Sequence, residues 1–325
     1  MSGRAFGLTF LSRYGFLVVF LGFFIFFATQ SDAFLNTSNL VNILEGNTIL
    51  LVAALGMTLV VASGGIDLSI GIAIDFGGWL AIVAMMDHDV AWPLAIVVGV
   101  IVGAAVGAFN SFLIVWLGVS PFLATLGTFF IGGSIQQIYT SGGGQVPFRQ
   151  MPTGYQELAT GETWGIPNEI LIGAVVLFVF YVLLERSIYG KRIHAIGLQP
   201  SAAAVAGINV RAYLWMTFVV ASATASVGGI ISTAGLRQFT PLAGFSYLLD
   251  AIAAVFIGAS MHPQQRPNVG GTLVGVLFLG MVSNGLNLMG LDFNFRDALE
   301  GLVLVGAIAL AVSQRRLPGR VGSPA

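Results

Sequence analysis

The sequence predicts an all-α, polytopic membrane protein with about ten transmembrane helices. Hydrophobic residues make up 56% of the chain and charged residues only 8%, against roughly 25% charged residues in soluble domains. The mean hydropathy is +0.91. The 325 residues are therefore better counted in membrane spans of about 20 apolar residues each than in soluble domains. We expect a single transmembrane domain that covers residues 1–325.

Apolar stretches separated by polar or turn-forming residues define the predicted spans. The first stretch follows Arg4 and Arg13 and could instead be a signal peptide, because Ala28-Thr29-Gln30 resembles a cleavage site. We favour an uncleaved helix, since the further spans make a separate export signal unnecessary. The predicted spans are 14–30, 40–62, 69–86, 92–117, 121–140, 168–185, 211–235, 247–260, 270–290 and 296–313.

Basic residues set the predicted orientation. With both termini inside, the inner side would receive ten lysines and arginines and the outer side three, as the positive-inside rule requires. Loop 141–167 then faces outward and loop 186–210 faces inward. The inner set is Arg4, Arg13, Arg186, Lys191, Arg192, Arg211, Arg266, Arg315, Arg316 and Arg320, and the outer set is Arg149, Arg237 and Arg296.

The number of spans and the spacing of glycines make two further predictions. Ten spans divide into two sets of five, and an odd number per half means that the second half enters from the opposite side. That is the topology of an inverted repeat. Glycines four residues apart allow helix backbones to approach closely in lipid. They are Gly99, Gly103 and Gly107, then Gly271 and Gly275, with Gly280 and Gly285 following.

Three aspartates lie where lipid makes a carboxylate costly, at least ~2.5–3.5 kcal/mol on insertion scales. Asp67 or Ser69 could cap the helix that starts beside them, and Asp67 could equally face a path through the membrane. Asp75 lies too far inside its apolar helix to cap it, so it meets a polar partner or lines a cavity. Asp250 either bonds Ser246 or a neighbouring amide near the outer end of its span, or has a functional role.

Amides and hydroxyls inside the spans form a second polar class. They can join helices by hydrogen bonds, or recognise a hydroxylated solute, since hydroxyl groups pair well with neutral donors and acceptors. Asn284 and Asn287 are three residues apart and share a helix face. The set is Asn110, Thr125, Thr128, Gln136, Gln137, Ser283, Asn284 and Asn287.

Composition and motifs also exclude several functions. The chain has no cysteine and its three histidines are far apart, which argues against a metal site. There is no glycine-rich lysine loop that would hold a nucleotide phosphate, and no pair of carboxylates shares a helix face, so we expect no catalytic residues. The net charge of −1 argues against a nucleic-acid partner.

Several segments, in one order, resemble the membrane permeases of bacterial ABC importers for monosaccharides, the family of the ribose, xylose, arabinose and galactofuranose permeases. The first is Ser63-Gly-Gly-Ile-Asp-Leu-Ser69, followed by Ile-Gly71. The others are Asn110-Ser-Phe-Leu-Ile, Ser120-Pro-Phe-Leu-Ala-Thr-Leu-Gly127, Tyr189-Gly-Lys-Arg-Ile-His-Ala-Ile-Gly197, Ala202-Ala-Ala-Val-Ala-Gly-Ile208 and Leu249-Asp-Ala-Ile-Ala-Ala-Val-Phe-Ile-Gly258.

Three positions depart from the family pattern. Asp75 stands where relatives usually carry a small or apolar residue. The segment Ser260–Asn268 replaces a glycine-rich turn, and Asn110-Ser111 replaces Asn-Gly. The aspartate weakens any transfer of substrate identity.

The resemblance implies a fold like that of type II ABC importer permeases and a place in the bacterial inner membrane, with both termini cytoplasmic. It implies three protein partners: a second permease, identical or related, a cytoplasmic ATPase that binds ATP and Mg, and a periplasmic sugar-binding protein. Proline at position 200 and glycine at 207 are typical of a short helix, which the resemblance makes the coupling helix seated in the ATPase.

From the resemblance and the polar residues together we assign candidate roles. The translocation path or gate set is Gly64, Gly65, Asp67, Asp75, Asn110, Phe122, Thr125, Asp250, Asn284 and Asn287. The ATPase-coupling set is Gly197, Pro200, Ala202, Ala203, Val205 and Gly207. The binding-protein docking set is Arg149 and Arg237.

Two alternatives remain open from the sequence. One is an ion-coupled secondary transporter that uses Asp67 and Asp250 as proton or cation sites. The other is an ABC permease of the same fold for nucleosides, branched-chain amino acids or a signalling sugar. Under the predicted topology, Ser63–Ser69 lies at the inner end of its span. We therefore expect a hinge or inner gate there and solute contacts nearer Asp75 and the asparagines.

Overall fold

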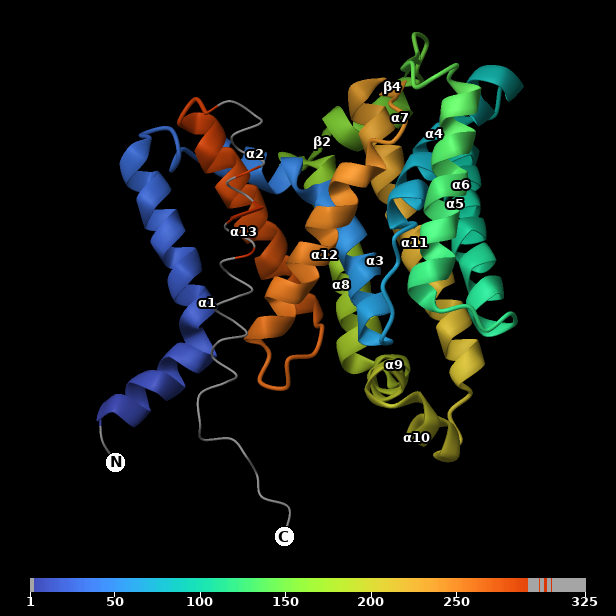
Figure 1. Cartoon of the computed structure of the whole chain (residues 1–325). Helices are drawn as coiled ribbons and strands as arrows, with labels where there is room; N and C mark the ends of the chain where they lie inside the picture. Colours follow the sequence, from blue (N-terminus) through green and yellow to red (C-terminus); the bar gives the residue numbers. More distant parts are fainter. Residues whose placement is uncertain (1–2, 292–297, 299–300, 303–304, 306–325) are drawn as a thin grey trace.

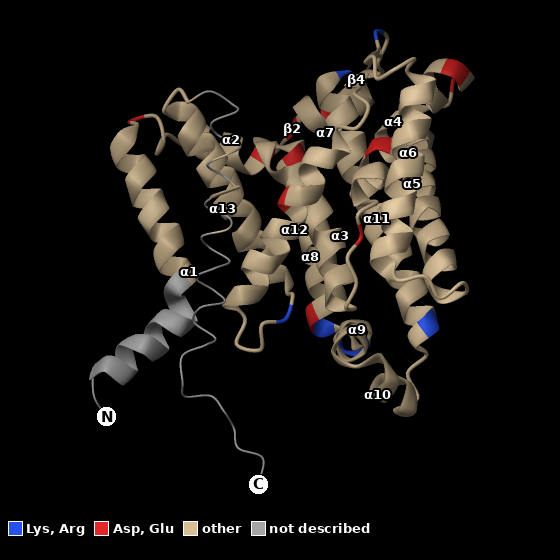
Figure 2. Cartoon of the chain, viewed as in Figure 1, with Lys and Arg blue, Asp and Glu red and all other residues tan. Residues whose placement is uncertain are grey.

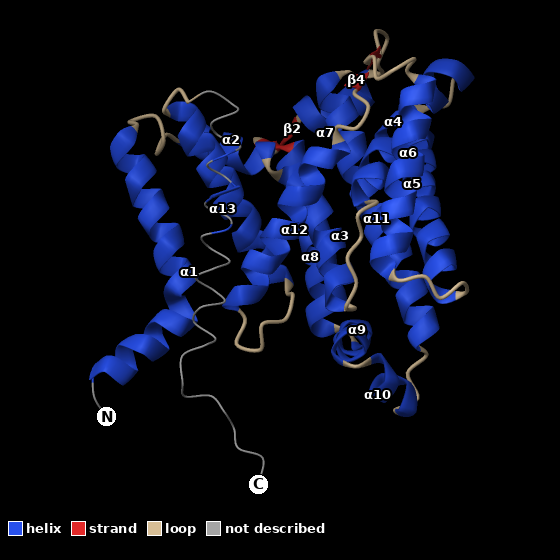
Figure 3. Cartoon of the chain, viewed as in Figure 1, coloured by secondary structure: helices blue, strands red, loops and turns tan. Residues whose placement is uncertain are grey.

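Long apolar helices run side by side, and shorter helices lie across both ends of the bundle (Figures 1 and 3). The computed structural model describes residues 3–291, 298, 301–302 and 305, with side chains from residue 16 onward. The long helices are α1 (Gly3–Gln30), α3 (Thr48–Ala62), α4 (Ile70–His88), α5 (Trp92–Val115), α6 (Pro121–Tyr139), α8 (Asn168–Phe180), α11 (Val210–Leu236), α12 (Gly244–Met261) and α13 (Val269–Leu288).

Short elements occupy the two predicted polar loops, 141–167 and 186–210, and some lie elsewhere in the chain. The short helices are α2 (Thr37–Gly46), α7 (Thr153–Thr160), the π-helix η1 (Tyr181–Arg186), α9 (Ile188–Leu198) and α10 (Pro200–Val205). Strand β1 (Val146–Pro147) pairs antiparallel with β4 (Gln238–Phe239), and β2 (Glu162–Thr163) with β3 (Ile166–Pro167). The predicted helix that starts at Pro200 is present, whereas α9 was not predicted.

Within the described residues, six helices are long and apolar enough to cross a membrane. They are α4, α5, α8 together with η1, α11, α12 and α13. A seventh results if α2 and α3, which are bent by 44° at Asn47, count as one span. The chain is therefore a multi-pass membrane protein. The last predicted span, 296–313, lies almost wholly outside the described residues.

The two ends of the bundle differ in charge (Figure 2). We call the end with α9, α10 and the α12–α13 turn the lower end, and the end with α7 and the four strands the upper end. The described cations of the predicted inner set belong to η1, α9, the start of α11 and the α12–α13 turn, so they lie at the lower end. They are Arg186, Lys191, Arg192, Arg211 and Arg266. Arg149 and Arg237 belong to the upper end.

Glycines bring the central helices into backbone contact, as their spacing predicts. Helix α11 packs along α5, α4 and α3. A Cβ at Gly103 would meet Ser226 of α11, and one at Gly229 would meet the carbonyl of Ile74 on α4. The predicted packing role is confirmed, because Gly99, Gly107, Gly271, Gly275, Gly280 and Gly285 likewise face a neighbouring element with no room for a side chain.

Gly229 provides a test of this packing. In Gly229→Ala the new methyl group lies on the Ile74 carbonyl, so α4 and α11 must move apart, at a cost of about 1–3 kcal/mol. We expect a lower midpoint of thermal unfolding in detergent. The control is Gly127→Ala in α6, where a Cβ meets nothing within 4 Å and the gain in helix propensity is up to about 1 kcal/mol. Equal midpoints for the two variants would contradict the packing argument.

Candidate functional site

The chain breaks its helical path between α3 and α4, at the segment Ser63–Ser69. Helix α3 ends at Ala62, and Gly64 takes a left-handed conformation with φ of 87° against the backbone of Gly197 on α9. From there the segment climbs from the lower end into the bundle, where α4 begins at Ile70 (Figures 1 and 3). The break starts at the lower end, as expected, but Asp67 does not stay there.

Asp67 is the start of a buried chain of hydrogen bonds. Its Oδ1 accepts from the backbone N–H of Ser69 at 2.8 Å and from the Ser69 hydroxyl at 2.6 Å. The amide Nδ2 of Asn110 donates to Ser69 Oγ at 2.6 Å, and the Thr128 hydroxyl donates to Asn110 Oδ1 at 2.6 Å. Asp67, Ser69 and Asn110 are fully buried. We call Asp67, Ser69, Asn110 and Thr128 the lower network.

The lower network lies inside the bundle. Asn110 precedes the end of α5 by five residues and Thr128 follows the start of α6 by seven. At 1.5 Å per helical residue, these positions are about 8–10 Å from the lower ends of the two helices. Irregular backbone at such a depth requires protein partners. Asp67 supplies one to the Ser69 amide, whereas the Ser69 side chain makes no capping bond. Of the two predicted alternatives, it is therefore Asp67 that accepts at the start of this span.

Thr125 adds a second hold on the same segment. Its Oγ1 accepts from the backbone N–H of Leu68 at 3.1 Å and lies 2.9 Å from the carbonyl oxygen of Pro121. Helix α6 therefore holds the break in two ways. Thr125 bonds Leu68 directly, and Thr128 bonds Asn110, which in turn bonds Ser69. The sequence singles out Asp67, Asn110 and Thr125 as candidates for the path or gate. It does not predict that Ser69 connects Asp67 to Asn110 or that Thr125 bonds Leu68.

A second break lies between α11 and α12. Arg237 and Leu242 have left-handed backbones, with φ of 54° and 62°. The first residue of α12, Gly244, packs against Gly71 in the first turn of α4. Asp75 Oδ1 accepts from the Gly244 N–H at 2.8 Å, and Gln136 Oε1 accepts from the Leu242 N–H at 2.8 Å.

Asp75 thus caps a helix other than its own. The sequence showed that it was too far along α4 to cap that helix, and this is correct. Its bond to the buried amide of Gly244 at the start of α12 could not be read from the sequence, because the two residues are 169 positions apart. A carboxylate is favoured at that point, since the N-terminus of a helix carries a partial positive charge.

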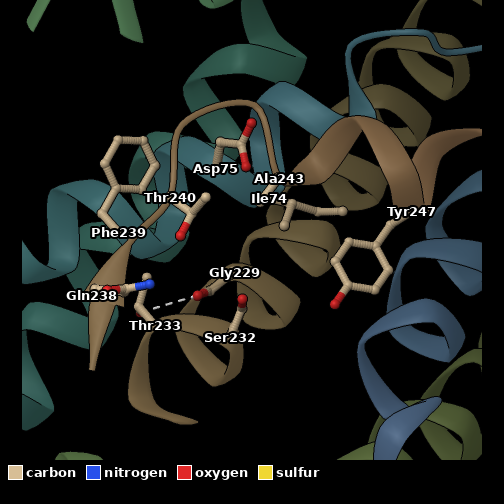
Figure 4. Close-up of a pocket in the computed structure, with 10 residues that line it drawn as sticks. All are labelled: Ile74, Asp75, Gly229, Ser232, Thr233, Gln238, Phe239, Thr240, Ala243 and Tyr247. Carbon is tan, nitrogen blue, oxygen red and sulfur yellow. Dashed lines mark hydrogen bonds between the residues drawn. The ribbon is translucent and has the colours of Figure 1, made fainter. Parts of the chain in front are cut away.

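Asp75 also lines a cavity beneath the second break (Figure 4). The cavity has a volume of about 10 Å³, which is room for about one water molecule. The cavity is therefore closed to an organic solute in this conformation. Its lining is Ile74, Asp75, Gly229, Ser232, Thr233, Gln238, Phe239, Thr240, Ala243 and Tyr247.

The remaining path candidates lie on α6, α12 and α13. Asn284 forms a reciprocal amide pair with Asn39, with both N–H···O distances at 3.0 Å, and so ties α13 to α2. Asn287 is exposed on α13, and Phe122 is 50% exposed on α6. Asp250 is half-buried on α12, and the Ser246 hydroxyl donates to the carbonyl of Ala243.

The predicted coupling residues lie together at the lower end. Leu198 at the end of α9 and Val205 at the end of α10 have 87% and 91% of their surfaces exposed, while Ala203 is buried. Gly207 ends the segment with φ of 82°. Gly197 presses against Ala62 and Gly64, so α9 is in contact with the first break.

The surroundings of one histidine beside this region, His194, lower its pKa. Burial lowers the pKa of His194, and the positive charge of Arg266 lowers it further, against the opposing effect of Glu185. The imidazole of His194 therefore loses its proton more readily than a free histidine side chain does.

Known proteins match almost the whole chain. Residues 39–308 match the family described as branched-chain amino acid transport system, permease component. The ribose import permease protein RbsC of Bacillus subtilis is 36% identical, over 90% of this chain and 91% of that protein. RbsC of Escherichia coli K12 is 31% identical, over 86% and 88%. The D-allose transport system permease protein AlsC of Escherichia coli is 27% identical, over 93% and 92%. No solved structure matches the chain.

The chain belongs to this permease-component family. The predicted resemblance to monosaccharide permeases of ABC importers is confirmed, since the relatives carry the names of sugar permeases. The chain is accordingly a membrane subunit of a transport system and not an enzyme.

Asp67 tests the lower network. In Asp67→Ala the N–H and hydroxyl of Ser69 lose their acceptor in the interior, which costs about 1–3 kcal/mol. Asp67→Asn keeps an acceptor oxygen, so we expect a smaller loss. Thermal unfolding in detergent measures both, with the exposed Asp87→Ala as the control, which should change little. An Asp67→Ala protein as stable as the parent would show that the network does not hold the break.

Proposed function

We propose that the chain forms the translocation path of an ATP-driven importer for a monosaccharide, a pentose, hexose or related polyol. The observation that carries this proposal is the match to ribose, allose and galactose permeases along most of the chain, at 27% to 36% identity. The description of the family names branched-chain amino acids, whereas the individual relatives are named as sugar permeases. We infer a sugar because the names of the individual relatives are more specific than the family description.

The polar groups inside the bundle agree with a hydroxylated solute. Asn110, Thr125, Thr128 and Gln136 are neutral groups that both donate and accept hydrogen bonds. In the present closed conformation they hold the two breaks. We propose that the path opens beside them, so that Asp67, Asp75, Asn110 and Thr125 exchange bonds within the chain for bonds to the solute or to water.

The proposed topology has ten spans in two inverted sets of five, with both termini in the cytoplasm and the lower end inside. Two features support it. The described lower end is the more basic one. Each half also contains a break followed by a helix that starts inside the bundle, and the two starting turns meet at Gly71 and Gly244. Transporters with inverted repeats commonly place broken helices together at mid-membrane.

The proposed partners fit the two ends. A cytoplasmic ATPase, which carries the ATP and Mg, would bind the exposed apolar residues of α10. A periplasmic sugar-binding protein would meet the exposed Arg149 and Arg237. A second permease, identical or related, would complete the path, in the bacterial inner membrane.

The contacts suggest how ATPase movement would reach the path. Gly197 of α9 touches Ala62 and Gly64, and the segment after Gly64 carries Asp67 and Ser69. A shift of α9 and α10 would therefore pull on the lower network and, through Asn110 and Thr128, on α5 and α6. Gly64 would then act as the hinge of an inner gate.

Uptake into proteoliposomes tests the function. The permease is reconstituted with its ATPase and supplied with binding protein and radiolabelled ribose, allose, galactose or leucine. We expect ATP-dependent uptake of one of the sugars that survives an uncoupler, and no leucine uptake. Uptake that collapses with the ion gradient and needs no ATP would favour the secondary transporter. Leucine uptake would favour the amino-acid reading.

Val205 tests the coupling surface. Val205→Asp places a charge on a side chain that is 91% exposed, so the permease should fold normally and lose most of the ATPase that co-purifies with it. The control is Gln264→Asp, an exposed position in the α12–α13 turn at the same end, which should retain the ATPase. Deletion of residues 200–207 should abolish co-purification. Full yield from that deletion would refute the assignment.

A further inference from the structure

Cations without an acidic partner gather where η1 joins α9. Arg186, Lys191 and Arg192 are exposed, and within the described residues none of the three forms an ion pair. The adjacent acid, Glu185, accepts from the backbone N–H of Val269 at 3.1 Å and so is directed toward α13. Three positive charges are therefore available to a partner outside the chain.

Tyrosines hold the two arginines in place. Arg186 Nε donates to the Tyr181 hydroxyl at 2.7 Å, and its guanidinium lies 5.1 Å from the centre of that ring. Arg192 Nη1 donates to the Tyr213 hydroxyl at 2.6 Å, with its guanidinium 5.6 Å from that ring. A guanidinium has five N–H donors, so each arginine keeps donors for an anion. Planar, pre-oriented guanidinium groups suit phosphate.

The same cations border an exposed apolar surface on a helix that is long and apolar enough to span a membrane. On α8 and η1, Val175, Phe178 and Val182 have 62%, 66% and 43% of their surfaces exposed. This exposed apolar strip ends at Arg186. Helix α9 appears end-on in Figure 1 while the spans run from top to bottom, so it lies across the lower end. Amphipathic helices in that position place basic residues among lipid headgroups.

The exposed face of α9 is itself both apolar and basic. Ile188, with 65% of its surface exposed, lies three and four residues before Lys191 and Arg192, and so shares a face with them. The opposite face, with Gly190, Ile193 and Ile196, is buried. An acyl chain beside α8 would contact apolar side chains, and a phosphate beside α9 would contact basic side chains.

We infer that Arg186, Lys191 and Arg192 bind the phosphate headgroup of an anionic phospholipid at the lower face of the membrane. The bound lipid would fix α9, the helix that contacts Gly64 and leads into α10. The apolar strip favours a lipid over an acidic protein surface, because it places the cations at the edge of the hydrocarbon. The inference depends on the membrane location of the chain and not on which solute is transported.

Native mass spectrometry of the detergent-solubilised permease tests the site. The apparent Kd for phosphatidylglycerol is compared with that for phosphatidylcholine, and glycerol phosphate is added as a headgroup without acyl chains. We expect tighter binding of phosphatidylglycerol and no competition by glycerol phosphate. In Arg186→Gln/Arg192→Gln the preference should fall about fivefold for each charge removed.

The matched control removes two arginines from the upper end. Arg149→Gln/Arg237→Gln should keep the preference for phosphatidylglycerol. Lys191→Gln is a variant that should fold normally, because that side chain makes no hydrogen bond within the described residues. Its preference for phosphatidylglycerol should fall about fivefold. An unchanged preference in Lys191→Gln and in the double variant would overturn the inference.

Two further outcomes would also overturn the inference. Equal losses in the lower and upper double variants would show a general charge effect. The Arg186→Gln/Arg192→Gln variant could also keep its lipid preference and lose the ATPase in phosphatidylcholine nanodiscs. That result would assign the cations to the binding of the ATPase. The lipid measurement needs neither solute nor ATPase, so it can fail while the proposed import function stands, and the reverse also holds.

Discussion

The structure depends on one constraint: backbone polar groups inside a lipid bilayer must find partners within the protein. Uninterrupted helices meet this constraint by themselves, but in the described part of the chain residues 63–69 and 237–243 leave the helical path and pack against the helices of the bundle. At each break a buried carboxylate and a buried amide or hydroxyl accept hydrogen bonds from backbone N–H groups that have no helical partner there. Asp67 with Thr125 serves the first, and Asp75 with Gln136 serves the second.

Glycine makes this arrangement possible. A carboxylate on one helix reaches the free amide of another only if the two backbones lie close together. Gly71 and Gly244 provide that approach where α4 and α12 begin, and Gly229 provides it between α4 and α11. Gly64 and Gly197 make the same kind of contact between the first break and α9. The residues that permit tight packing are therefore also those through which a movement at the lower end would reach the interior.

Several features followed from the sequence because each has a local physical cause. Apolar length predicts spans, small residues four apart predict close packing, and proline with glycine predicts α10. A break at Ser63–Ser69 is visible as two glycines beside an acid. Asp67 and Asp75 could be recognised as unusual because a charge inside apolar helices is costly wherever its partner lies.

The partners themselves were decided by tertiary structure alone. Asp75 bonds Gly244, Asn284 pairs with Asn39 and Asn110 reaches Ser69 across separations of 169, 245 and 41 residues. No periodicity or local motif encodes such contacts, since they depend on which helices become neighbours. For the same reason the sequence placed Asp67 at an inner gate, whereas the climb of residues 63–69 carries it into the bundle. Composition determined that polar groups would have to be satisfied, and helix packing determined which ones satisfy each other.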